Sequence, residues 1–161
     1  MALFGFGRKE PKTPKIPPNA LPGDPKWVRN RHGKYYRLVH LDTQAEHLGE
    51  TSGIYVIWHS GVAPRWVWVD RADNLGHAID GIQDNDEVMF YEKHGGLYVT
   101  WAPVRSEYQP GVLRYLHEQM KPEITNPDVR HIDADPVPVY IPGTRRTKDG
   151  GEDPAAGTLP G

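Results

Sequence analysis

Residues 52–69, SGIYVIWHSGVAPRWVWV, contain two short apolar runs rich in β-branched and aromatic residues, a composition typical of β-strands. The loop between the runs, residues 59–65, contains a glycine and a proline. We therefore predict a hairpin in which residues 54–58 pair antiparallel with residues 66–69. Both runs are apolar on both faces, so we expect them to lie at the centre of a sheet that is covered on each side.

The hydrophobic period changes after the hairpin. Apolar residues now recur at helical spacing, at Leu75, Ala78, Ile79 and Ile82. Asp73 is in position to cap the first turn, so the pattern predicts a helix of about ten residues. Residues 85–96, NDEVMFYEKHGG, predict a second short helix that ends at its paired glycines.

Three further elements complete the predicted fold. Residues 33–41 and 97–104 have the composition of strands. A last helix is expected to begin at Pro110 and to end before Pro122. Its apolar stripe consists of Val112, Leu113, Leu116 and Met120. The order predicts an α/β (α+β) domain with a small antiparallel sheet flanked by helices.

Length and composition limit the class of protein. A chain of 161 residues suits one modest domain. It contains no cysteine, which excludes disulfides and thiolate metal sites and favours a reducing compartment, so we expect a cytoplasmic protein. No apolar run approaches the roughly 20 residues that span a bilayer.

Charge and proline content divide the chain. Residues 1–40 carry nine Lys or Arg and two acids, a net charge of +7, and the remainder carries −9. Residues 1–26 are rich in proline and are predicted to be a basic, flexible, extended arm. Residues 27–142 are predicted to form the globular domain, with its core in 52–126, and residues 143–161 a disordered tail. The first residues, MALFGF, could contact a membrane surface through Leu3, Phe4 and Phe6 or enter a groove on a protein partner.

The sequence GIYVIW, followed by a second aromatic strand and by Asn-Leu at 74–75, resembles the GIY-YIG nuclease domain over residues 52–126. The strands are similar to those of a bacterial subgroup of that family, and residues 114–126, RYLHEQMKPEITN, resemble the family's last helix with its Pro and Asn. The resemblance implies a small antiparallel sheet flanked by helices. It also implies a phosphodiester-cleaving site made of two tyrosines, an arginine and a glutamate that holds a divalent metal.

At most of the positions that form that site, this chain has a different residue. Tyr55 matches the first tyrosine, but the resemblance puts Trp68 at the second tyrosine and Asp70 at a glycine. It puts Ala78 at the arginine and Leu113 at the glutamate. Asp70 would repel a phosphate. Ala78 supplies no cation and Leu113 supplies no metal ligand. The resemblance therefore implies a pseudo-nuclease without metal or cofactor.

A slipped register would give a different interpretation. Arg71 could replace the family's arginine, and Glu118 lies about one helical turn beyond Leu113. The rival hypothesis is therefore a divergent, metal-dependent DNA endonuclease. Two other clusters combine potential metal ligands without a recognised spacing, and we interpret them as solvated loop residues: His40, Asp42, Glu46 and His47, and His131, Asp133 and Asp135.

The sequence thus predicts a non-catalytic adaptor whose basic arm docks on an acidic protein partner. A third hypothesis is nucleic-acid binding without cleavage, which would depend on the +7 of residues 1–40. The strand tryptophans are expected mainly to fill the core, although they could stack on bases. The candidate binding residues are Arg8, Lys9, Lys12, Lys15, Tyr55, Trp68 and Arg71.

Overall fold

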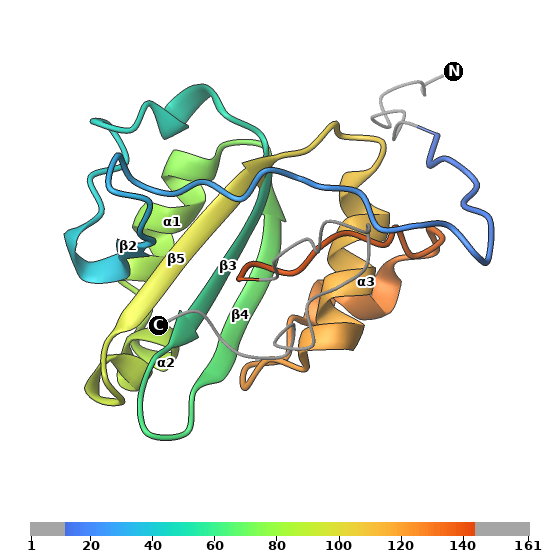
Figure 1. The fold of residues 1–161 in the computed structure, drawn as a ribbon. Coiled ribbons are helices and arrows are strands. Elements are labelled where there is room, and N and C mark those ends of the chain that lie inside the picture. Colours follow the sequence, from blue (N-terminus) through green and yellow to red (C-terminus); the bar gives the residue numbers. More distant parts are fainter. Residues whose placement is uncertain (1–11, 144–161) are drawn as a thin grey trace, which may run out of the picture.

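A four-stranded antiparallel sheet forms the centre of the fold in the computed structural model, which describes residues 12–143 (Figure 1). The strands are β2 (Tyr36–Arg37), β3 (Gly53–His59), β4 (Arg65–Ala72) and β5 (Leu97–Pro103), and their order across the sheet is β2-β5-β3-β4. Helices pack on both faces, which confirms the predicted fold class. No helix among residues 12–143 has the length and apolarity that a membrane span requires.

The β3–β4 hairpin forms as predicted. Val56 pairs with Val69, and the register shifts between Ile57 and Trp58, so β4 carries a bulge at this point. All seven residues of β3 are buried, as expected for a central strand. The same expectation is wrong for β4, which is an edge strand. Only Val67 and Val69 of β4 are fully buried, and because of the bulge they belong to two different core clusters.

Residues 123–126 cover the free edge of β4. The backbone N–H groups of Glu123 and Ile124 donate to the carbonyls of Trp66 and Val67 at 2.9 and 3.1 Å. The side chain of Asn126 donates to the carbonyl of Val69 at 3.1 Å. An edge strand otherwise presents unpaired backbone groups to other chains, so this segment takes the place of a fifth strand.

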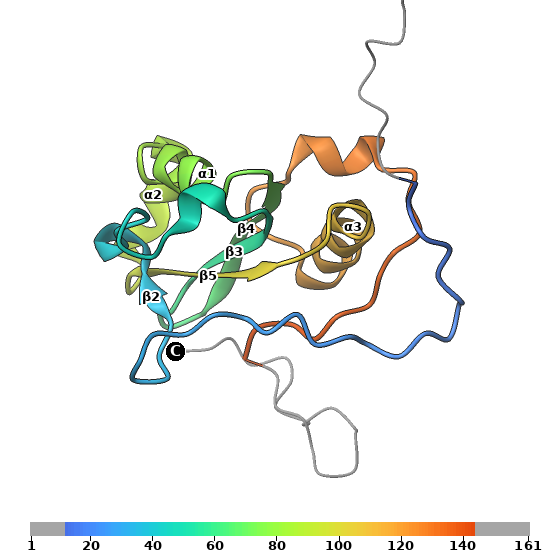
Figure 2. The same cartoon turned by 90° about the horizontal axis from the view of Figure 1, so that it is seen from above.

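Helix α1 (Leu75–Gln83) and helix α2 (Asp86–Met89) lie on one face of the sheet (Figure 2). Asn74 caps α1 by accepting a hydrogen bond from the His77 N–H at 2.9 Å, so the prediction that Asp73 is the cap is wrong by one residue. A 3-10 turn, η3 (Phe90–Lys93), follows α2. The chain then stops being helical at Gly95 and Gly96, which have φ of +88° and +95°, as the sequence predicted.

Helix α3 (Gln109–Met120) covers the opposite face of the sheet (Figure 2). Its predicted stripe is buried in one core cluster with Ile54, Val56 and Trp58 of β3. The cluster on the α1 side contains Tyr55 and Ile57. Alternate residues of β3 thus belong to two separate cores.

The predicted strand at residues 33–41 is mostly wrong. Only Tyr36 and Arg37 pair with β5, and the 3-10 turn η1 (Leu38–His40) follows. Leu38 and Leu41 are both buried on the α1 side. Residues three apart share a face in a 3-10 turn but not in a strand, and the Gln83 side chain donates to both leucine carbonyls. The other 3-10 turns are η2 (Leu48–Glu50) and η4 (Pro127–His131).

The described part of the predicted arm, residues 12–26, is mostly exposed but makes contact with the domain. Gly23 pairs in parallel with Val139: its N–H donates to Pro138 at 3.0 Å and its carbonyl accepts from Tyr140 at 2.9 Å. The two segments run side by side in both views of the ribbon (Figures 1 and 2). The predictions for residues 1–11 and 144–161 lie outside the described residues.

Candidate functional site

The hairpin brings three of the predicted site residues together on the α1 face of the sheet. Tyr55 on β3 lies directly opposite Asp70 on β4, and Trp68 lies two residues earlier on the same strand. The Trp68 indole N–H donates to the Tyr55 hydroxyl at 3.0 Å. Tyr55 is 2 % exposed, so the hydroxyl that would have to meet a substrate is enclosed by protein.

Burial controls the protonation of Tyr55. Loss of solvent raises the pKa of this phenol, the nearby Asp70 carboxylate raises it further, and the hydrogen bond from Trp68 only partly opposes these effects. Tyr55 is therefore a neutral phenol throughout the physiological range. It cannot act as a phenolate nucleophile or base without a cation to stabilise the charge.

Asp70 is also held in an environment that disfavours its charge. Burial raises the pKa of this carboxyl, and Asp128 adds to the effect. A hydrogen bond from the Arg71 N–H to Oδ1, at 2.7 Å, and a hydrogen bond from the Asn126 side chain act in the opposite direction. The carboxyl points back to its own backbone and to residues after α3.

Asn126 is a site residue that the sequence analysis used only as part of the family resemblance. Its side chain is 2 % exposed, donates to Val69 and accepts from the Asp128 N–H at 3.0 Å. Its own N–H donates to His117 Nε2 at 3.1 Å. Burial lowers the pKa of His117, so the unprotonated nitrogen needed for this contact is favoured. An Asn before Pro after the end of a helix is a capping signal that could have marked this position.

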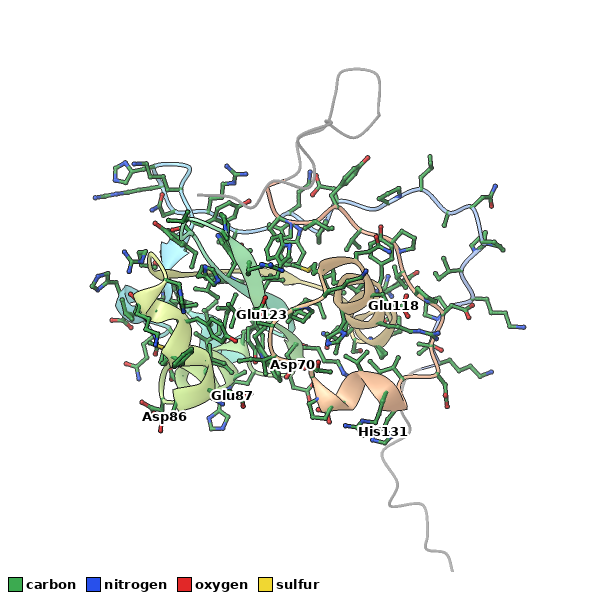
Figure 3. The ribbon with its side chains drawn as sticks, turned by 90° about the horizontal axis from the view of Figure 1, so that it is seen from below. Asp70, Asp86, Glu87, Glu118, Glu123 and His131 are labelled. Carbon is green, nitrogen blue, oxygen red and sulfur yellow. The ribbon has the colours of Figure 1, made fainter. Side chains whose placement is uncertain are left out.

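The other two predicted positions do not join Tyr55 in one site. Ala78 packs against the same core cluster as Tyr55. Leu113 is fully buried in the cluster on the other face of the sheet. Glu118 projects from α3, whereas Asp70 belongs to β4 (Figure 3). Glu118 is exposed and pairs with Arg114 at 3.3 Å, so the two do not form a shared carboxylate site.

Two other candidate binding residues meet at a surface cavity. Lys12 and Arg71 line a cavity of about 640 Å³ together with Asp128, His131 and Asp133. The side chains that line this cavity include both basic and acidic groups. Lys15 is exposed nearby in the chain, where the Ile16 N–H donates to Asp135 Oδ2 at 3.3 Å. Arg8, Lys9, Leu3, Phe4 and Phe6 lie outside the described residues.

Potential metal ligands are not gathered into a metal-binding group. Among residues 12–143, no three His, Asp or Glu side chains are arranged to hold a metal ion. In the first predicted cluster, Asp42 Oδ1 accepts the N–H groups of Gln44 and Ala45, both at 3.0 Å, and so closes a turn. His131 and Asp133 line the Lys12–Arg71 cavity.

No protein-family model matches the chain, and no curated protein or solved structure matches it. The resemblance to the GIY-YIG domain therefore stays a prediction that depends on the residues quoted above.

Replacing Asp70 with asparagine should stabilise the protein at neutral pH. The folded-state pKa of Asp70 lies above its ordinary value of 3.8, so the folded state binds the proton more tightly and wild-type stability falls as pH rises through that pKa. Asn keeps an oxygen for the Arg71 N–H but carries no charge. We expect Asp70→Asn to be more stable by about 0.5–1 kcal/mol at pH 7, with the difference vanishing below about pH 3.8.

Thermal unfolding followed from pH 3 to pH 7 measures this effect. Asp133→Asn, at an exposed carboxylate, removes the same charge without relieving burial and should give no comparable gain. A variant Asp70→Asn that is less stable than wild type at pH 7 would show that the Asp70 charge stabilises the fold.

Proposed function

We propose that this chain is a non-catalytic interaction protein built on a degenerate GIY-YIG-like domain, which docks on an acidic protein partner through its basic, proline-rich N-terminal segment. The observation that carries the proposal is the hydrogen bond from the Trp68 indole to the hydroxyl of the buried Tyr55. In an active site of this family the matching hydroxyl would have to reach a phosphodiester. Here that hydroxyl belongs to a buried side chain and accepts a hydrogen bond from the Trp68 indole.

Electrostatics supports the same conclusion. Phosphodiester cleavage develops negative charge that a cation must neutralise. Asp70 lies beside Tyr55, and Ala78 has no charge to offer from α1. A phosphate placed beside Tyr55 would meet a neutral phenol and a carboxyl group, with no lysine or arginine from α1.

The basic segment is the proposed docking element. Lys12 and Lys15 are exposed, and the prolines around them restrict the backbone before binding, which lowers the entropy lost when the segment is ordered on a partner. Exposed charges of one sign also steer association with an anionic surface. We propose that this interaction takes place in the cytoplasm, because a sequence without cysteine suits a reducing compartment.

Deleting residues 1–15 should abolish binding to the native partner and leave the melting temperature nearly unchanged. The deletion keeps Ile16, whose N–H donates a hydrogen bond to Asp135, and Gly23, which forms a parallel β-bridge with Val139. Partners are captured by crosslinking in the native host and identified by mass spectrometry, and the affinity of the purified pair is then measured. Replacing Arg8, Lys9, Lys12 and Lys15 with alanine should reproduce most of the loss, and added salt should weaken the intact complex.

The matched control removes four exposed positive charges elsewhere, by replacing Arg65, Arg105, Lys121 and Arg130 with alanine. This variant should retain binding. Equal affinity of the truncated and intact proteins would overturn the docking role of the segment. Separately, Mg²⁺- or Mn²⁺-dependent DNA cleavage that disappears in Glu118→Ala would support the nuclease hypothesis and overturn the non-catalytic one.

A further inference from the structure

A basic turn precedes the sheet in a chain whose remainder is acidic. Residues 25–41 contain five Lys or Arg and no acid. The chain reverses at residues 30–34, where the Asn30 N–H donates to the Lys34 carbonyl at 2.7 Å and Gly33 takes a φ of +74°. The Asn30 side chain accepts from His32 and Lys34 at 2.9 and 3.0 Å. The turn therefore has a defined conformation that holds its positive side chains at the surface.

Three of these cations have no carboxylate partner in the described part of the chain. Lys26 pairs with Asp24, and Arg37 pairs with Glu92. Arg29, Arg31 and Lys34 are exposed and make no ion pair with an acid among residues 12–143. No carboxylate of residues 12–143 therefore neutralises these three charges.

A pocket of about 330 Å³ lies beside this turn, and three of its walls are aromatic: Trp27, Tyr35 and Tyr140. Asp24 also lines the pocket, where it is paired with Lys26 at 3.1 Å. These walls are fixed by the fold. The Trp27 indole donates to the Tyr140 carbonyl at 2.6 Å, and Tyr35 packs edge-on against the buried Trp58 at 5.0 Å between ring centroids. The pocket is formed where the segment before β2 runs beside residues 138–143 (Figure 2).

Arg29 adds a flat cationic surface to the pocket. Its guanidinium carbon lies 4.5 Å from the centre of the Tyr35 ring, and Nη2 donates to the Tyr35 hydroxyl at 3.0 Å. A guanidinium stacked on a ring leaves its outer face open. Planar cations of this kind stack on nucleobases and bind phosphates with their remaining N–H groups.

We propose that this pocket binds single-stranded nucleic acid, with one unstacked base against Trp27, Tyr140 and Arg29 and the adjoining phosphates held by Arg29, Arg31 and Lys34. Aromatic platforms beside a positive surface are the pattern of single-strand recognition. An acidic peptide would use the positive charges but would leave the aromatic walls without a planar partner. The site goes beyond the proposed adaptor role and does not depend on it.

The test is fluorescence anisotropy of a labelled 12-nucleotide oligo(dT) titrated with the full chain. Replacing Arg29, Arg31 and Lys34 together with glutamine should weaken binding about tenfold or more and lower the slope of log affinity against log salt by about two. Arg29→Lys keeps the charge and removes the planar group, so it should weaken binding about threefold or more. A deletion of residues 1–15 should bind as the intact chain does.

The matched control replaces Arg65, Arg105 and Arg130 with glutamine, which removes the same charge from other exposed positions and should bind as wild type. Each variant is checked for an unchanged melting temperature. Wild-type affinity in Arg29→Lys, equal affinity for a duplex of the same length, or equally effective competition by a glutamate 12-mer would each overturn the proposal. The last result would assign the turn to acidic peptides.

Discussion

Replacing Leu113 with glutamate is expected to destabilise the fold by about 3 kcal/mol or more. This substitution would restore the residue type that the family resemblance implies at position 113. Leu113 is 0 % exposed and packs with Val56 and Leu116 in the cluster between β3 and α3. A carboxylate placed there loses its hydration and gains no cation. Chemical denaturation followed by circular dichroism measures the loss.

Two control variants separate the burial of a charge from the loss of the leucine and from the charge itself. Leu113→Met nearly conserves volume and should cost less than about 1.5 kcal/mol. Gln119→Glu introduces the same charge on the exposed face of α3 and should change stability by no more than about 0.5 kcal/mol. If Leu113→Glu were as stable as these two, position 113 would be open to water and a catalytic carboxylate could be accommodated there.

The hairpin and the helices could be predicted because their signals are local. The two β-branched runs, the loop between them and the helical spacing of Leu75 to Ile82 each specify an element within about ten residues. Asp73 and Asn74 are both good caps, so composition alone could not choose between them. The run at residues 33–41 misled the prediction. Its aromatic and aliphatic residues, including Leu38 and Leu41, also suit a short strand followed by a 3-10 turn.

The candidate site could be predicted only in part. Tyr55, Trp68 and Asp70 come together because the register of one hairpin determines their positions. The family resemblance puts Leu113 in the same site, but the sequence does not say which face of the sheet its helix covers. The aromatic pocket beside Arg29 combines residues more than 100 positions apart, and no local pattern links Trp27 to Tyr140.

Asn126→Ala is expected to cost about 2–4 kcal/mol. The buried amide makes two kinds of contact that alanine cannot replace: it donates to the Val69 carbonyl, and it accepts from the Asp128 N–H at the start of η4. Leaving a buried carbonyl unsatisfied costs about 1–3 kcal/mol, and losing a cap costs about 1 kcal/mol more. Thermal and denaturant unfolding should both report the loss.

Asn74→Ala is the matched control. Asn74 caps α1 from an exposed position, and the capping bond is the one hydrogen bond of its side chain within residues 12–143, so its loss should be limited to about 1 kcal/mol. The excess cost in Asn126→Ala then measures the interaction with β4. Because residues 123–126 cover the edge of that strand, the same variant should also aggregate at lower temperature than Asn74→Ala when light scattering is followed during heating. Equal losses in the two variants would mean that Asn126 acts only as a cap. In that case the backbone hydrogen bonds from Glu123 and Ile124 to β4 would protect the edge by themselves.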